Sequence, residues 1–283
     1  MKNFIVPVDF SIESMNGISM AALFSKHQQI HVHLIHVLPL STEGIKNNTE
    51  AEFETAEKNL KKIVKDSSLL LGNNSVIDYT IKSGRVFHEI VTLAEQTPDS
   101  IIAASTHGAS GFQEFFIGSN AYRIISATHL PVITLRKNFC PANISKIVLP
   151  IDLSVDTRQK VPFTTEIARL FGAEIHVVGI QTSKNQRDVK KVRSYTSQVA
   201  GFIEGKLHCV SNEVHGSNVD DLVLNYAHTV RADMISITTE NSSGLSLILG
   251  NTAHHILNKA EIPVLCNTPK NLRKSGTFVT TGG

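Results

Sequence analysis

Short apolar runs alternate with longer amphipathic segments along the first half of the chain. The apolar runs have the length of strands buried on both faces, and they lie at residues 4–8, 30–38, 75–82, 99–104 and 132–136. Between them, apolar residues recur at helical spacing, which predicts helices at residues 13–25, 50–71, 85–96 and 121–128. Strands and helices that alternate in this way predict an α/β domain with a doubly wound parallel sheet.

The second half of the chain repeats the first. The segment Ile5-Val-Pro-Val-Asp-Phe-Ser11 reappears as Val148-Leu-Pro-Ile-Asp-Leu-Ser154, at an offset of 143 residues. Further on, residues 130–133 reappear as residues 262–265 at an offset of 132, so the second copy is shorter in its middle. Internal similarity over this length predicts two homologous domains in tandem.

The repeat also sets the expected domain boundaries. We expect the first domain at residues 1–138, the second at residues 146–270 and a poorly ordered polar tail at residues 271–283. Between the domains, Pro141 and small polar residues interrupt both periodicities. The second domain is expected to have strands at residues 146–151, 174–180, 206–214, 233–237 and 264–267, and helices at residues 156–171, 186–203, 218–229 and 252–259.

The composition excludes several classes of protein. Of the 283 residues, 41% are hydrophobic and 18% are charged, and the formal net charge of +2 gives no strong field for nucleic acid or an anionic membrane. No apolar run approaches the length of a transmembrane helix, and the first run ends at Asp9, too early for a signal peptide. The three cysteines lack metal-type spacing and suit a reducing cytosol. We therefore expect a cytoplasmic protein that binds neither nucleic acid nor membrane.

The candidate chemistry lies in the loop after the fourth expected strand. The loop contains Gly108, Gly111 and Gly118, and Ser119 and Asn120 follow at the start of a helix. Glycines let a backbone approach a ligand closely, and a helix start presents free N–H groups and a partial positive charge. Such a loop suits a phosphate group. The alternative is that the glycines only shape a tight loop and that Ser119 only caps the helix.

Two further candidates follow the first two expected strands. Asp9 comes directly after the first strand, and Val37 lies at the end of the second. In an open parallel sheet, ligands bind beyond the carboxyl ends of the strands, where the strand order reverses. If the first and fourth strands are neighbours at that point, Asp9, Val37 and residues 105–119 line one crevice.

In these residues the chain resembles the universal stress protein family. The likeness rests on Val-Pro-Val-Asp-Phe-Ser at residues 6–11, on His36-Val37, and on the spacing Gly-x2-Gly-x9-Gly-Ser/Thr that runs into a helix and then Pro-Val-hydrophobic. It covers nearly the whole chain, twice. The resemblance implies, in each domain, a five-stranded parallel sheet of order 3-2-1-4-5 with helices on both faces. Some members of this family bind ATP, and others lack the loop pattern and do not.

The resemblance implies an ATP site in the first domain, with one departure from the pattern. Ser105 stands where the family has its first glycine, and its side chain either crowds the nucleotide or adds a hydroxyl. In such a site Asp9 would face the adenosine, the Val37 backbone would meet the adenine, and the glycine loop would meet the phosphates. The nucleotide-binding residues that the resemblance implies are Pro7, Asp9, Val37, Ser105, Gly108, Gly118, Ser119 and Asn120.

The second domain departs further from the pattern. Ile237 and Glu240 stand where the pattern has its first two glycines, although Asn251 at the later position still caps a helix well. A carboxylate at Glu240 would repel a triphosphate, so we expect ATP in the first domain only. Asp152 is retained, and we expect it to be a structural residue at a strand end.

Neither a metal site nor a catalytic centre is expected. His31 and His33 share one face of the second expected strand and His36 lies on the other, so a zinc site would need further ligands such as His107 or an aspartate. The sequence has no Walker-type Gly-Lys-Ser/Thr and no Gly-x-Ser-x-Gly. Without a loop lysine and an acidic magnesium partner, rapid ATP hydrolysis is not expected. We therefore expect a protein that is not an enzyme.

Three functional hypotheses remain open. In the first, ATP in the first domain changes how a stress-response module engages an unidentified protein partner. In the second, both sites are degenerate and the chain is an interaction or scaffold protein without nucleotide. In the third, the chain is a slow nucleotidase or acts on another phosphorylated ligand. The resemblance also implies that the two domains form a pseudo-symmetric pair through their last strands, and that whole chains form homodimers.

Overall fold

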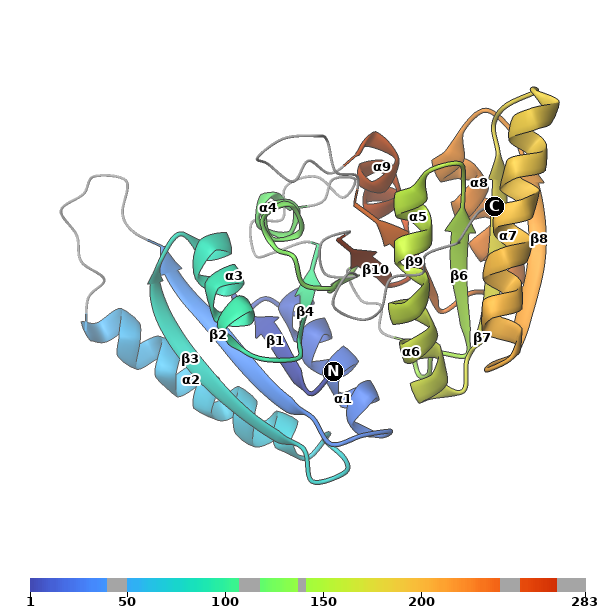
Figure 1. Cartoon of the computed structure of the whole chain (residues 1–283). Helices are drawn as coiled ribbons and strands as arrows, with labels where there is room; N and C mark the ends of the chain where they lie inside the picture. Colours follow the sequence, from blue (N-terminus) through green and yellow to red (C-terminus); the bar gives the residue numbers. More distant parts are fainter. Residues whose placement is uncertain (40–49, 107–117, 137–140, 240–249, 269–283) are drawn as a thin grey trace. The chain divides into compact units, whose positions relative to one another are not determined.

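The computed structural model describes residues 1–39, 50–106, 118–136, 141–239 and 250–268 of the chain. These residues belong to two compact units, Met1–Cys140 and Pro141–Gly283 (Figure 1). The polar tail expected at residues 271–283 lies outside the described residues.

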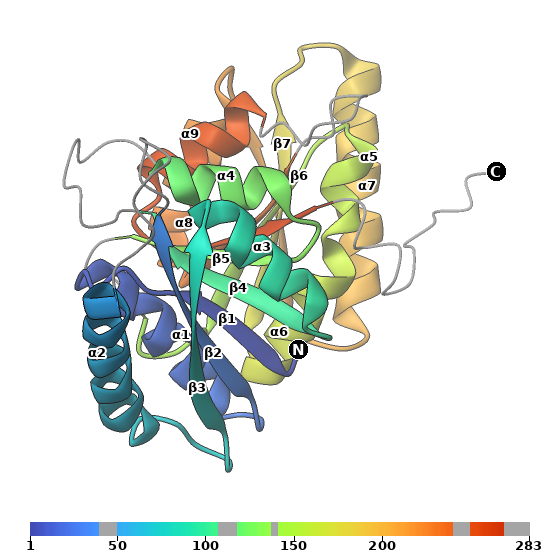
Figure 2. The ribbon, with the colours of Figure 1, turned by 90° about the vertical axis from the view of Figure 1, so that its left-hand side faces the viewer.

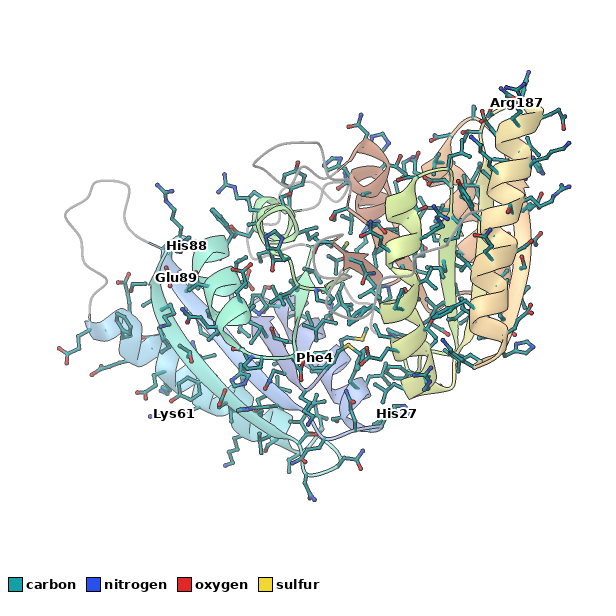
Figure 3. The ribbon with its side chains drawn as sticks, in the orientation of Figure 1. Phe4, His27, Lys61, His88, Glu89 and Arg187 are labelled. Atoms are coloured by element: carbon teal, nitrogen blue, oxygen red, sulfur yellow. The ribbon has the colours of Figure 1, made fainter. Side chains whose placement is uncertain are left out.

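The first unit contains a parallel sheet with the order β3-β2-β1-β4-β5. Its strands are β1 (Asn3–Pro7), β2 (His31–Pro39), β3 (Val76–Gly84), β4 (Ser100–Ser105) and β5 (Val132–Leu135). The central strand β1 is apolar because it is covered on both faces, and Phe4, Ile5 and Val6 are fully buried. Figure 3 labels Phe4 on this strand. Burial of such side chains stabilises the unit by about 1.5–3 kcal/mol each.

Helices cover both faces of this sheet. They are α1 (Asn16–Ser25), α2 (Glu50–Ser68), α3 (Val86–Gln96) and α4 (Ser119–Ala127). Figures 1 and 2 show α1 and α2 on one face and α3 and α4 on the other. The long helix α2 buries Ala56 and Leu60, whereas Lys61 on its outer side forms an i,i+4 ion pair of 2.9 Å with Glu57 (Figure 3).

The second unit repeats this topology with the order β8-β7-β6-β9-β10, again with parallel strands. Its strands are β6 (Lys146–Ile151), β7 (Glu174–Gln181), β8 (Cys209–His215), β9 (Met234–Thr238) and β10 (Val264–Asn267). Its helices are α5 (Val155–Gln159), α6 (Val161–Phe171), α7 (Gln186–Glu204), α8 (Val219–Val230) and α9 (Asn251–Lys259). The expected fold, two doubly wound α/β copies of order 3-2-1-4-5, is confirmed.

Two helices differ from the expected elements. The helix expected at residues 156–171 is divided into α5 and α6, and Lys160 lies between them. The physical reason is Pro162 in the first turn of α6, because proline has no N–H to donate to the carbonyl four residues earlier. The helix expected at residues 13–25 begins as a 3-10 turn, Glu13–Met15, before α1.

In the described part of the chain, no helix combines the length and the apolar character needed to cross a membrane.

Candidate functional site

A cavity of about 390 Å³ opens at the carboxyl ends of β1, β2 and β4 in the first unit. β1 and β4 are adjacent, and this adjacency was the condition for the predicted crevice. The expected nucleotide-binding residues that line the cavity are Pro7, Asp9, Val37, Ser105, Gly118, Ser119 and Asn120. Gly108, the remaining expected residue, lies outside the described residues.

The turn after β1 presents Asp9 at the rim of this cavity. The Asp9 carboxylate accepts hydrogen bonds from the backbone N–H of Ser11, at 3.0 Å, and from the Ser11 hydroxyl. Phe10 has a φ of 65°, which is uncommon for a residue with a side chain. Its ring stacks on the His36 ring with centroids 4.3 Å apart. These contacts hold the turn and fix the direction of the exposed Asp9 carboxylate.

His36 connects the ends of the first two strands. Its Nδ1–H donates to the carbonyl oxygen of Val8 at 2.7 Å, and the Val8 N–H donates to the carbonyl of Ile35 at 2.9 Å. His36 also lines the cavity beside Val37. Sequence reasoning used the His36-Val37 pair for the family resemblance but did not include His36 among the site residues.

The amino end of α4 forms another wall of the cavity. Gly118 is the N-cap, and its N–H donates to the carbonyl oxygen of Thr106 at 2.6 Å. A Cβ at position 118 would lie 2.9 Å from that oxygen, so the close approach of the two segments requires glycine whether or not a ligand binds. Ser119 is the first helical residue, so the alternative in which Ser119 caps the helix is wrong.

This end of the cavity favours a negative charge. The first-turn N–H groups of α4 have no acceptor within the helix, and the turn contains no acidic residue. Among the described lining residues, the ionisable side chains are those of Asp9 and His36, and there is no lysine or arginine. An anion would therefore be held by backbone groups rather than by a cationic side chain.

Apolar residues from α3 and α4 complete the cavity. Val86 and Ile90 come from the start of α3, and Ile124 comes from α4. These residues were part of the apolar stripes that predicted the two helices, but the stripes alone did not distinguish cavity walls from core. Together with Val37, these residues give part of the cavity wall an apolar character.

The histidines at the other end of β2 form a separate cluster. His31 Nε2 and His33 Nδ1 lie 2.8 Å and 2.9 Å from the two carboxylate oxygens of Asp78 on β3. Burial lowers the pKa of His33. Asp78 is the nearby aspartate that the sequence could not place, because it is brought to His33 by the register of β2 and β3. His107, the other ligand considered, lies outside the described residues.

The second unit has a smaller cavity, of about 90 Å³, at the corresponding sheet edge. Asp152 lines it, and one carboxylate oxygen accepts hydrogen bonds from Ser154 N–H at 2.7 Å and from the Thr157 hydroxyl at 2.9 Å. Gly250 is the N-cap of α9, so the expectation that Asn251 caps this helix is wrong. Glu240, the residue expected to repel a triphosphate, lies outside the described residues.

Comparison with known proteins identifies the family. The model of the Universal stress protein family matches residues 1–136 and again residues 143–266. The chain belongs to the universal stress protein family. A universal stress protein of Methanocaldococcus jannaschii is 26% identical over 146 residues, which cover 48% of this chain and 82% of that protein. Universal stress protein G of Escherichia coli O157:H7 is 26% identical over 141 residues, which cover 48% of this chain and 99% of that protein.

Solved structures extend the likeness to both copies at once. The crystal structure of a universal stress protein from Archaeoglobus fulgidus matches with a TM-score of 0.77 at 16% identity, over 94% of this chain and 98% of that one. A structure from Pseudomonas aeruginosa matches with a TM-score of 0.69 at 18% identity, over 97% of this chain and 96% of that one. At these identities the matches show a shared fold of two tandem universal stress protein domains.

Proposed function

We propose that this tandem universal stress protein binds ATP in its first domain and uses the bound nucleotide to regulate contact with a protein partner. Asp9 would bind the ribose, the Val37 backbone would bind the adenine, and the amino end of α4 would bind the phosphates. Gly108 would contribute to phosphate binding from the loop that the structure does not describe.

The observation that carries this proposal is the convergence of separately predicted residues on one cavity. Asp9 follows β1, Val37 and Ser105 lie on β2 and β4, and Gly118 is the N-cap of α4, yet all four line the same space of about 390 Å³. The lining of that space includes a carboxylate suited to ribose hydroxyls and the free N–H groups of a helix start. A nucleotide has matching groups at its two ends.

The cavity supports binding better than catalysis. Rapid phosphoryl transfer needs cationic groups on the phosphates and an acidic magnesium ligand placed next to them. Among the described lining residues there is no lysine or arginine, and Asp9 lies at the end proposed for the adenosine. We therefore propose a regulatory module rather than an enzyme. Release of ADP from bound ATP in a turnover assay would instead identify a slow nucleotidase.

The described cysteines support a proposal about the cellular compartment. Cys209 and Cys266 are free cysteines, and burial raises the pKa of both, that of Cys209 to about 11. Free thiols are typical of proteins in the reducing cytosol. We propose that the protein acts in the cytoplasm, where ATP is available to it.

A matched pair of substitutions tests the proposed site. Asp9→Asn keeps the shape of the side chain and removes its charge, and Asp152→Asn makes the same change at the equivalent position of the second domain. Calorimetric titration of the full chain with ATP should show binding about tenfold weaker for Asp9→Asn, a loss of ~1.4 kcal/mol, and unchanged binding for Asp152→Asn.

Two results would contradict the proposal. If ATP at millimolar concentration releases no heat from the unmodified chain, the scaffold hypothesis replaces nucleotide binding. If Asp152→Asn weakens binding and Asp9→Asn does not, the nucleotide occupies the second domain instead. Circular dichroism of both variants shows whether each has kept its fold.

A further inference from the structure

A buried lysine lines the cavity of the second domain. Lys160 lies at the break between α5 and α6, and its side chain is only 1% exposed. It lines the space of about 90 Å³ at the carboxyl ends of β6 and β9. Among the described side chains, none forms an ion pair or a hydrogen bond with the Lys160 ammonium.

Burying the Lys160 ammonium costs free energy unless a group of opposite charge or a hydrogen-bond acceptor stabilises it. An ammonium group that leaves water without a partner loses several kcal/mol of hydration. Burial lowers the pKa of Lys160 to about 8, while the charge of Asp152 opposes that shift. Because about 8 is still above neutral pH, the lysine remains mostly protonated. The cavity therefore holds a largely desolvated ammonium group, whose charge the Asp152 carboxylate in the same lining offsets in part.

A second group in the same cavity also lacks a partner. Thr239 directly follows β9, is 2% exposed, and has a buried hydroxyl without a hydrogen-bond partner among the described residues. Thr252 and Ala253, in the first turn of α9, line the cavity as well, and this turn contains no acidic residue. An ammonium, a hydroxyl and a helix amino end all favour a negative charge at one place.

The remaining walls combine apolar residues with the polar residues Ser154, Thr157 and Thr238. Ile180, Val223, Ile237 and Ile256 line the cavity, and all four are almost fully buried. A second cavity of about 170 Å³ shares Asp152, Ser154, Ile180 and Val219 with the first. The space therefore suits a compact apolar body attached to one anionic group.

We infer that the second domain binds a small monocarboxylate with an apolar body, and that Lys160 provides the counter-charge. The single lysine matches a charge of −1, and the Asp152 carboxylate, which also lines the cavity, disfavours a dianionic phosphate. Thr239 and the first turn of α9 donate the remaining hydrogen bonds to the carboxylate oxygens.

The two domains would then hold anions by different means. At the offset of 143 residues, Lys160 corresponds to Gly17 of the first domain. A Cβ at Gly17 would lie 2.6 Å from the Ala103 carbonyl oxygen, so that position has no room for a side chain. Both domains offer the amino end of a helix to a ligand, but in the described residues only the second adds a lysine side chain to its cavity. The loss of the glycine pattern in the second domain therefore accompanies the gain of another site.

Titration of the full chain with hexanoate, in the absence of nucleotide, tests this inference. Hexanoate should bind, and its uncharged analogue hexanamide should bind about tenfold more weakly, since only the anion pairs with Lys160. Lys160→Met should weaken hexanoate binding by a similar factor. The control Lys206→Met removes an exposed lysine of the same domain, which rests on the Phe202 ring, and should leave binding unchanged.

A second variant keeps the test independent of any change in folding at Lys160. Thr239→Val preserves the shape of the side chain, removes the unpartnered hydroxyl and should weaken hexanoate binding severalfold. The inference is overturned if no straight-chain carboxylate from acetate to octanoate binds, or if hexanamide binds as well as hexanoate. Tighter binding of inorganic phosphate than of any carboxylate would overturn the assigned ligand class.

Discussion

Ser105 is the last residue of β4 and lines the first domain's cavity, where the family pattern has its first glycine. Its position next to Thr106, whose carbonyl oxygen accepts the Gly118 N–H, places its side chain at the junction of strand and loop. A hydroxymethyl group there takes space that a glycine would leave to the nucleotide. The proposed ATP site therefore predicts that the size of the side chain at position 105 limits the affinity for ATP.

Substitutions at position 105 test this effect of side-chain size. Ser105→Gly should tighten ATP binding about threefold to tenfold, because it restores the space near the phosphates, and this corresponds to ~0.7–1.4 kcal/mol. Ser105→Thr adds a methyl group and should weaken binding. Calorimetric titration of the unmodified chain and the two variants with ATP ranks the three affinities. The reverse order would mean that the Ser105 hydroxyl contributes a hydrogen bond to the ligand.

Lys160 gives the second domain a stability that depends on pH. Its pKa in the folded chain is lowered from 10.5 to about 8, so between these values the unfolded chain binds more protons than the folded chain. The free energy of unfolding should therefore rise by about 3 kcal/mol as the pH rises from about 8 to above 10.5. Urea unfolding of the unmodified chain and of Lys160→Met measures the difference.

The substituted protein provides the control for that measurement. Lys160→Met has no buried charge to desolvate, so it should be more stable than the unmodified chain at neutral pH and should lack this rise. Equal pH profiles for the two proteins would mean that the ammonium is solvated in the folded chain.

Sequence reasoning located the candidate site of the first domain more completely than that of the second. Asp9, Val37 and Gly118 could be placed together because the carboxyl ends of parallel strands meet at one edge of the sheet. Val86 could not be assigned, because its role depends on how α3 packs over the strands. Lys160 was missed because a lysine within an amphipathic pattern is normally solvated, and only the helix break brings it into the cavity.

At the scale of the elements, the packing of α1 depends on one small residue. Gly17 lies in the first turn of α1, and a Cβ there would be 2.6 Å from both the Ala103 carbonyl oxygen on β4 and the Val6 Cγ1 atom on β1. The helix can approach the sheet this closely because position 17 has no side chain. This contact supports the two strands whose ends carry Asp9 and Ser105.

A pair of glycine-to-alanine substitutions tests this packing. Gly17→Ala should lower the free energy of unfolding by about 1–3 kcal/mol, because the backbone of β4 cannot move aside cheaply. Gly201→Ala, at an exposed position of α7 with no atom within 4 Å of the added Cβ, should raise it by about 0.5–1 kcal/mol. Urea denaturation followed by circular dichroism measures both. A neutral Gly17→Ala would show that α1 can shift away from the sheet.

The order and type of the elements could be predicted because each strand has a short continuous apolar run and each helix has apolar residues at helical spacing. β6 and β10 have the expected bounds, and the other described strands differ from theirs by a few residues at their ends. The division between α5 and α6 was missed although Pro162 was visible, because the apolar periodicity continues across it. Periodicity reports which face is buried, whereas continuity of the helix depends on backbone hydrogen bonds.

At the scale of the molecule, two copies of one fold carry different cavities. The first measures about 390 Å³ and ends at a glycine N-cap, and the second measures about 90 Å³ and contains a buried lysine. The family match to both copies and the shared topology indicate duplication of one domain. The proposed ATP site and the inferred carboxylate site would then give one chain binding sites for two different small molecules.

The stoichiometry of ATP binding to the full chain tests most directly the proposal that only the first domain binds ATP. Native mass spectrometry and calorimetry with magnesium and ATP should both give one nucleotide per chain, because only the first domain combines the large cavity with the glycine N-cap. The nucleotide should remain bound in Lys160→Met and be largely lost in Asp9→Asn. Two nucleotides per chain, or none, would contradict an ATP site confined to the first domain.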